Sequence, residues 1–284
     1  LQQYPNLPTT QITSLVEEQY KTYYSSNKAT IDQQVINLAN QMKEQYKDEN
    51  GYPYSSDIDT YAHLRYARNY LDHGYIGDEY RTINGKQVQW DTKMVSPIGT
   101  PINDNLHPKV LAYLYKIMHT FNGKITLMQS SNYLPVIFMC LAIIPIFFIG
   151  RRFGGNVGAL FSSLIFVIMP ALIMRSSFWH YDTDIWSIFF PVYVVWFLFL
   201  SIDTSNRSLK IVYATLSGLT LGIFANFWSG WWFLFDFIIG GVVVYMLYLF
   251  IFKLPFDKIK EYVISIGVFV ISTIIFVSMF TSVA

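Results

Sequence analysis

From about residue 127 to its end, the sequence consists of apolar runs, each close to the twenty residues that an α-helix needs to cross a bilayer. The runs cover about 127–150, 155–174, 185–201, 210–227, 232–252 and 262–284. Hydrophobic residues make up 52% of the chain and charged residues only 14%, whereas a soluble domain carries about a quarter charged residues. The sequence therefore predicts an α-helical polytopic membrane protein with about six spans. With a net charge of +1, we expect no nucleic acid among its partners.

The first 126 residues precede these runs and carry most of the acidic residues, so we expect a mostly helical domain outside the bilayer. Over residues 1 to about 50, apolar residues recur at helical spacing in two stripes. Ser25-Ser26-Asn27 separates the stripes, and the pattern predicts a hairpin of two solvated helices. The chain begins without Met or a signal peptide and ends in an apolar run. We therefore expect a piece of a longer protein, cut at both ends.

A further helix is predicted at Asp57–Gly74, because the segment begins with acids and ends with Gly. Asp59 is a candidate N-cap that would satisfy the first backbone amides, and Asp57 is the competing cap. Asn84-Gly85 further along predicts a small hairpin within residues 80–90.

One polar interruption, residues 175–186, separates two of the apolar runs and carries Arg175, His180, Asp182 and Asp184. Ionisable residues between spans are costly unless they line water, a metal or an anion, so this loop is a candidate functional site. Asp182 and Asp184 stand two residues apart, so an extended segment can aim both carboxylates at one cation, with Mg²⁺ or Mn²⁺ favoured. Alternatively, one of these acids caps the next helix and Arg175 snorkels to the headgroups. His180 is expected to be a hydrogen-bonded packing residue.

Basic residues at alternate joints between the runs predict the orientation of the chain. They are Arg151, Arg152, Arg207, Lys210, Lys253, Lys258 and Lys260. The positive-inside rule places these joints in the cytoplasm. The first hundred residues, the loop with Asp182 and the Trp228–Trp232 joint then face the opposite side, so Asp59 and Asp182 share one compartment.

Two motifs and this topology resemble those of a known family. Asp59-Thr60-Tyr61-Ala62-His63-Leu64-Arg65 has an Asp followed two residues later by Tyr at the start of a helix, and Arg175 precedes Asp182-Thr183-Asp184. The chain resembles, from about residue 57 to its end, the membrane portion of the oligosaccharyltransferase catalytic subunit, of the archaeal or bacterial kind. These membrane enzymes make N-linked glycoproteins. The Trp-rich joint at residues 228–232 is also similar.

The resemblance implies a GT-C glycosyltransferase fold with a helical first external loop, in the cell membrane, with the active site on its extracytoplasmic face. It implies metal-dependent transfer of a glycan from a dolichyl or polyprenyl phosphate or pyrophosphate to Asn in an acceptor peptide with Asn-x-Ser/Thr. Trp228 and Trp231 would border the lipid-phosphate groove. A later acidic residue and the C-terminal acceptor-recognition domain of the family are not in this chain, so we expect only part of the active site.

The resemblance also implies roles for the polar residues. Asp182 resembles a metal ligand, and Asp184 resembles a ligand or a partner of the ligands. Asp59 resembles the group that contacts both the metal, Mg²⁺ or Mn²⁺, and the acceptor amide. Arg175 would balance the acidic cluster or meet the phosphate.

Two other functions remain open. A protein O-mannosyltransferase or another GT-C enzyme using lipid-phosphate sugars would share the acidic motif in the first external loop, but generally lacks the second loop with Arg and Asp-x-Asp. A transporter or flippase would use Asp182 and Asp184 for ion coupling, although such acids are expected near the middle of the membrane rather than at its surface. The sequon Asn206-Arg207-Ser208 falls on the predicted cytoplasmic side, so we expect it to be unmodified.

Overall fold

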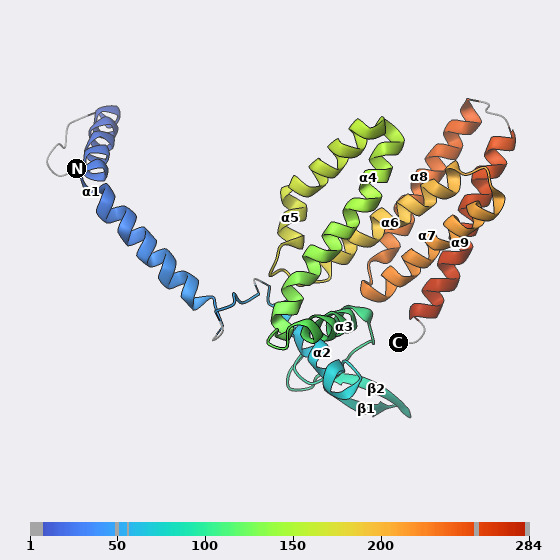
Figure 1. Ribbon diagram of the computed structural model, residues 1–284, viewed down its shortest axis with the longest axis horizontal. Coiled ribbons are helices and arrows are strands. Elements are labelled where there is room, and N and C mark those ends of the chain that lie inside the picture. Colours follow the sequence, from blue (N-terminus) through green and yellow to red (C-terminus); the bar gives the residue numbers. More distant parts are fainter. Residues whose placement is uncertain (1–7, 49–50, 56, 253–255, 282–284) are drawn as a thin grey trace. The chain divides into compact units, whose positions relative to one another are not determined.

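The computed structural model describes residues 8–48, 51–55, 57–252 and 256–281 (Figure 1). The chain divides into two compact units, Leu1–Tyr54 and Ser55–Ala284. The second unit therefore joins the membrane helices to most of the external segment, residues 55–126, that precedes them. Lys253 and the end of the span expected at 262–284 lie outside the described residues.

The first unit contains one long helix, α1 (Thr9–Gln45), so the predicted hairpin is wrong. The expected loop residues lie inside this helix because their side chains bond back to the preceding turn. Ser25 Oγ donates to Thr22 O, and Asn27 Nδ2 donates to Tyr23 O at 2.9 Å. Such bonds let short polar residues remain within a helix instead of ending it.

The second unit begins with helices and a small sheet that lie outside the spans: α2 (Asp59–His73), β1 (Glu79–Ile83), β2 (Lys86–Asp91), β3 (Thr100–Pro101) and α3 (Leu106–Phe121). The expected helix is confirmed as α2, which ends at His73 and is capped by Gly74 in the left-handed conformation, with φ 85°. The expected hairpin is confirmed as the antiparallel pair β1–β2. Asn84 and Gly85 both have positive φ in its two-residue turn, as a type I′ turn requires.

An ionic cluster fastens α2 to this sheet. Arg65 donates to Asp78 and, at 2.7 Å, to Asp91, whose side chain is fully buried. Asp91 also accepts a hydrogen bond from the Tyr66 hydroxyl and from two backbone amides. Burial opposes ionisation of Asp91, but these donors outweigh it and hold the pKa at about 2. The cluster is thus internally paired and has a structural role.

The remaining elements are α4 (Leu127–Ile168), α5 (Pro170–Ser176), α6 (Asp184–Asp203), α7 (Arg207–Phe227), α8 (Trp231–Ile251) and α9 (Phe256–Thr281). In the described part of the chain, five helices are long and apolar enough to cross a membrane, which confirms a helical polytopic membrane protein. The longest of these, α4, includes the first expected span and most of the second. Its helical geometry breaks at Gly154 and Gly155, and Ser162 Oγ donates to Ile146 O across the break, so its two arms run antiparallel.

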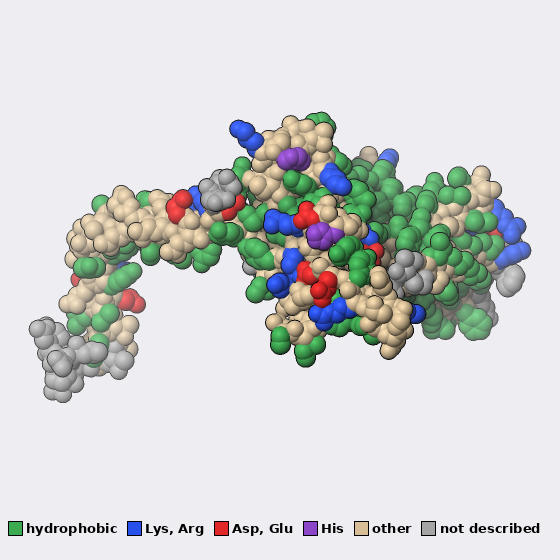
Figure 2. All heavy atoms as spheres, turned by 90° about the horizontal axis from the view of Figure 1, so that it is seen from below, with side chains coloured by type: hydrophobic (Ala, Val, Ile, Leu, Met, Phe, Trp, Pro, Cys, Tyr) green, Lys and Arg blue, Asp and Glu red, His purple; other side chains and the backbone are tan. Residues whose placement is uncertain are grey.

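The two ends of the helical bundle differ in chemistry. At one end, Arg152 forms an ion pair with Asp203 through two nitrogen–oxygen contacts of 2.5 and 2.7 Å. At the other end, Asn226 at the end of α7 accepts a hydrogen bond from Leu106 N and donates to Phe280 O. This second end carries α2, α3 and the sheet (Figure 1). Charged and histidine side chains gather over it in the view of Figure 2.

Candidate active site

The start of α2 and the loop between α5 and α6 are held together by two side-chain hydrogen bonds. Ser55 Oγ donates to Trp179 O, and Thr60 Oγ1 donates to Tyr181 O, each at 2.7 Å. Thr60 is fully buried, so its bond is shielded from water. These bonds join segments more than 120 positions apart in sequence. They bring the two predicted acidic motifs to one place.

Asp57, His180 and Asp182 meet where these segments join. Each offers one ligand atom, and these atoms all lie within 4.8 Å of one another. All three side chains are half-buried. His180 Nε2 is buried and has no hydrogen-bond partner among the described residues. Two carboxylates and an imidazole are a donor set that fits a divalent transition metal.

Asp182 is held ionised by its neighbours. His63 Nε2, one turn into α2, lies 3.5 Å from Asp182 Oδ1, and Thr183 N donates to the same oxygen at 2.6 Å. The contact with His63 is the main cause that lowers the pKa of Asp182 to about 2, against the opposing effect of burial. Asp182 is therefore an anion at any pH near neutrality. α6 begins at Asp184 with Thr183 as its N-cap and without a side-chain cap bond, so the alternative expectation that Asp182 or Asp184 caps the helix is wrong.

A cluster of buried aromatic side chains packs against His63. The His63 ring meets the His107 ring edge to face at 4.4 Å, and His107 stacks on Tyr181 at 4.5 Å. Trp186 Nε1 donates to His107 Nδ1 at 2.6 Å. His107 is only 1% exposed, and this burial keeps its pKa well below the usual histidine value. Because Nδ1 accepts a hydrogen bond from Trp186, the neutral His107 ring carries its own proton on Nε2.

Arg175 and Asp184 form an ion pair that borders His180. Arg175 Nη1 donates to Asp184 Oδ2 at 2.5 Å, and His180 Nε2 lies 3.7 Å from the same oxygen. The Arg175 side chain is largely exposed, at 61%. Arg175 therefore contacts one predicted acid and still faces solvent, where an anionic substrate group can reach it.

Asp59 is exposed at the first turn of α2, and it is Asp57 that bonds to the start of this helix, since Asp57 Oδ1 accepts from Asp59 N at 3.0 Å. Asp59 and Asp184 are not members of the group formed by Asp57, His180 and Asp182. The structure thus brings one of the three expected ligands, Asp182, together with two residues that were assigned other roles.

Trp228 borders two hollows at the same end of the bundle, and Trp231 borders one of them. One, of about 350 Å³, is lined by both tryptophans and by polar side chains that include Asp104 and Asn226. The other, of about 470 Å³, is almost wholly apolar and runs from Trp228 toward Phe237 between α6, α7 and α8. Phe227, next to Trp228, packs on Trp186 at 4.3 Å, which connects this region to the first turn of α6.

Sequence reasoning missed Asp57, His180, His63 and His107 as parts of the site. Two of these carried a signal. His63 stands four residues after Asp59, on the same helix face, and His180 stands two residues before Asp182, on the same side of an extended segment. No pattern in the sequence places His107 beside them, because that contact depends on how α3 packs against α2.

Comparison with known proteins identifies the family of the chain. Residues 29–284 match the family model described as oligosaccharyl transferase STT3, N-terminal. A dolichyl-phosphooligosaccharide-protein glycotransferase of Methanococcus voltae is 30% identical over 206 residues, which cover 72% of this chain and 22% of that protein. The chain thus spans about a fifth of the length of this relative.

Two solved structures of an Archaeoglobus fulgidus oligosaccharyltransferase share the fold at 16% identity. The complex with Zn and sulfate superimposes with a TM-score of 0.63 and covers 79% of this chain and 27% of that one. The complex with an inhibitory peptide and a dolichol-phosphate gives a TM-score of 0.60 and covers 78% and 25%. Since the family model matches nearly the whole chain, the chain belongs to the oligosaccharyltransferase family, as its N-terminal membrane portion.

Proposed function

We propose that the full-length protein transfers a glycan from a lipid-linked phosphate or pyrophosphate to Asn in Asn-x-Ser/Thr sequons. Family membership and the name of the Methanococcus voltae relative support this reaction. The observation that carries it is the meeting of Asp57 with His180 and Asp182, because it joins the two acidic motifs around one potential cation site. The peptide and dolichol-phosphate bound to the Archaeoglobus fulgidus enzyme are the kinds of partner that the reaction needs.

The cation site is formed by Asp182, Asp57 and His180. The cation would supply Lewis acidity to the departing phosphate oxygens. The imidazole favours Mn²⁺ over Mg²⁺ within the pair expected from the sequence, and the Zn in a related structure is consistent with a site that contains His. His63 keeps Asp182 ionised and oriented, in the manner of the outer partners that fix metal ligands.

The exposed Asp59 carboxylate accepts a hydrogen bond from the acceptor amide, whose nitrogen is a poor nucleophile and must be held close to the sugar carbon. The family resemblance also implies a contact between Asp59 and the cation, but Asp59 is not part of the group formed by Asp57, His180 and Asp182, so we assign its carboxylate to the acceptor amide alone. Arg175 meets a phosphate oxygen with the guanidinium N–H groups that Asp184 leaves unused. Asp184 in turn orients Arg175 and borders His180.

The donor lies beside Trp228 and Trp231. The apolar hollow below Trp228 accommodates part of the polyprenyl chain, and the polar hollow holds groups nearer the phosphate. The site faces the extracytoplasmic side, because the basic joints at the opposite end of the bundle are expected in the cytoplasm. This end of the unit is also the end that carries the polar elements α2 and α3 (Figure 1).

The test is a transfer assay with the full-length protein, a lipid-linked oligosaccharide and an Asn-containing peptide. Asp59→Ala and Asp182→Ala should each abolish transfer. Asp72→Ala is the matched control, because Asp72 is an exposed acid on the same helix α2. Transfer to a Ser/Thr peptide in place of the Asn peptide, or full activity of either test variant, would refute the proposal.

A further inference from the structure

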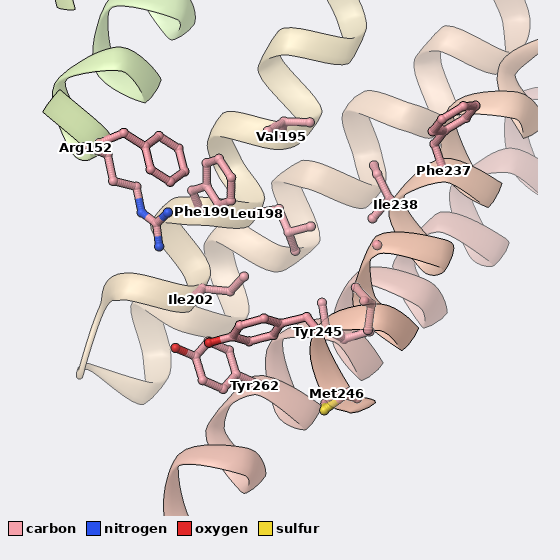
Figure 3. A pocket seen from close by; sticks show the side chains of 14 residues that line it. Arg152, Val195, Leu198, Phe199, Ile202, Phe237, Ile238, Tyr245, Met246 and Tyr262 are labelled. Atoms are coloured by element: carbon pink, nitrogen blue, oxygen red, sulfur yellow. The ribbon is translucent and has the colours of Figure 1, made fainter. Parts of the chain in front are cut away.

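A cavity of about 470 Å³ lies at the opposite end of the bundle from the candidate active site. Side chains from α4, α6, α8 and α9 line it, and Figure 3 shows its main residues. Residues of α8 form much of the wall, including Gly241, where an added Cβ would meet no atom within 4 Å. The proposed reaction leaves this cavity without a role.

The polar groups of the cavity are concentrated at one end. Arg152, Tyr245 and Tyr262 lie there, and the two tyrosine hydroxyls turn to the same side beneath the Arg152 guanidinium (Figure 3). From this end toward Phe237, the lining is apolar. Such a gradient matches an amphiphile whose polar group lies at the surface of the bundle and whose chain points toward the middle of the membrane.

Arg152 keeps donors for a ligand although it is ion-paired. Its contacts with Asp203 use Nε and Nη2, which leaves the Nη1 amino group outside that pair. Arg151 precedes it in the sequence and is exposed. A guanidinium with spare N–H groups beside tyrosine hydroxyls is a common way to bind a phosphate oxygen.

The volume of the cavity decides between a lipid chain and a further helix of the same protein. A helix of about twenty residues is about 30 Å long and 10 Å wide, so it occupies more than about 2,000 Å³. The cavity offers about 470 Å³, which lies in the range of pockets for small molecules. The cavity therefore has room for one acyl chain but does not enclose the body of a helix.

We propose that this cavity binds one phospholipid of the membrane leaflet opposite the active site, with its phosphate at Arg152 and the two tyrosines, and one chain along α8 toward Phe237. The lipid would fill the space between α8 and the helices α6 and α9. The proposal does not depend on the glycan-transfer reaction.

The experiment is native mass spectrometry of the full-length protein in a non-ionic detergent with added phosphatidylglycerol, and separately with a diacylglycerol of the same chains. Gly241→Leu places a side chain in the cavity, since Gly241 is helical and has open space around its Cβ position. Gly240→Leu is the matched control, because Gly240 is the neighbouring residue, has equal space and does not line the cavity. Retained glycan transfer in both variants would show that each of them folds.

Wild-type protein and Gly240→Leu should retain one phosphatidylglycerol, and Gly241→Leu should bind it about tenfold more weakly, because the lost chain contacts amount to about two methylenes. Arg152→Gln should lose the preference for phosphatidylglycerol over diacylglycerol. Asp203→Asn breaks the same ion pair but leaves the positive charge of Arg152 in place, so this variant should keep or strengthen the preference for phosphatidylglycerol. Equal phosphatidylglycerol binding by Gly241→Leu and Gly240→Leu would overturn the proposal, as would equal loss of preference in Arg152→Gln and Asp203→Asn.

Discussion

The hydrogen bond between Trp186 and His107 allows a quantitative test of how the buried aromatic residues next to His63 stabilise the protein. Trp186→Phe removes the donor and leaves His107 Nδ1 without a partner in a side chain that is 1% exposed. An unsatisfied buried acceptor costs about 1–3 kcal/mol. The smaller ring also loses contacts with Phe227 and Phe138, whose ring centroids lie 4.3 and 4.6 Å away, which adds roughly 1 kcal/mol. We expect the free energy of unfolding to fall by about 2–4 kcal/mol.

A double-mutant cycle isolates the hydrogen bond from the packing. His107→Phe alone leaves the Trp186 donor unsatisfied, whereas the double variant with Trp186→Phe leaves neither group unsatisfied. The double variant should therefore cost less than the sum of the single variants by about 1–3 kcal/mol. Trp196→Phe, which changes another tryptophan of α6 that stacks on Phe148, is the matched control.

The assay is equilibrium unfolding of the full-length protein in mixed micelles titrated with sodium dodecyl sulfate. Hydrogen exchange of the α3 amides provides a local measure, since His107 lies in the first turn of α3. Additive effects in the cycle, or an equal loss of stability in Trp186→Phe and Trp196→Phe, would refute the reasoning.

Three further predictions follow from single contacts. The pKa of Asp91 is lowered to about 2 from an ordinary 3.8, so ionised Asp91 should stabilise the folded state by about 2 kcal/mol above pH 4, and this contribution should disappear as the pH falls toward 2. Asp91→Asn should remove this pH dependence from acid unfolding curves, and an unchanged curve would contradict the assignment. His63→Ala should weaken Mn²⁺ binding about tenfold in calorimetric titration, because it releases Asp182 from its oriented state, and undiminished affinity would exclude that role. Asn206 should carry no glycan in peptide mass spectra, since its side chain caps α7 by accepting a hydrogen bond from Ser208 N. A glycan on Asn206 would contradict the predicted orientation of the chain in the membrane.

Much of the architecture was predictable because it depends on local patterns. Apolar length predicted the membrane helices, and Asn84-Gly85 predicted the β1–β2 turn, since few residues adopt positive φ there. The hairpin expected in α1 failed because short polar residues were taken as a loop, although they bond back within the helix. The family resemblance was confirmed by the matching family model.

The site was predictable only in part. The two acidic motifs were identified, but which side chains meet depends on backbone geometry at the start of α2 and in the loop before α6. Trp179 in that loop has a φ of 65°. Few non-glycine residues adopt this conformation, and no pattern in the sequence predicts it. The choice between Asp57 and Asp59 rests on such details, because the two residues stand only two positions apart.

The proposed cation site is tested most directly by the Mn²⁺ affinity of the full-length protein. The affinity is measured for three variants: Asp57→Asn, Asp59→Asn and the control Asp72→Asn. The geometry predicts that Asp57→Asn binds at least about tenfold more weakly, because a ligand is lost, while Asp59→Asn binds like the control and fails in glycan transfer. If Asp57→Asn binds Mn²⁺ as well as the control does, the group formed by Asp57, His180 and Asp182 is not the metal site.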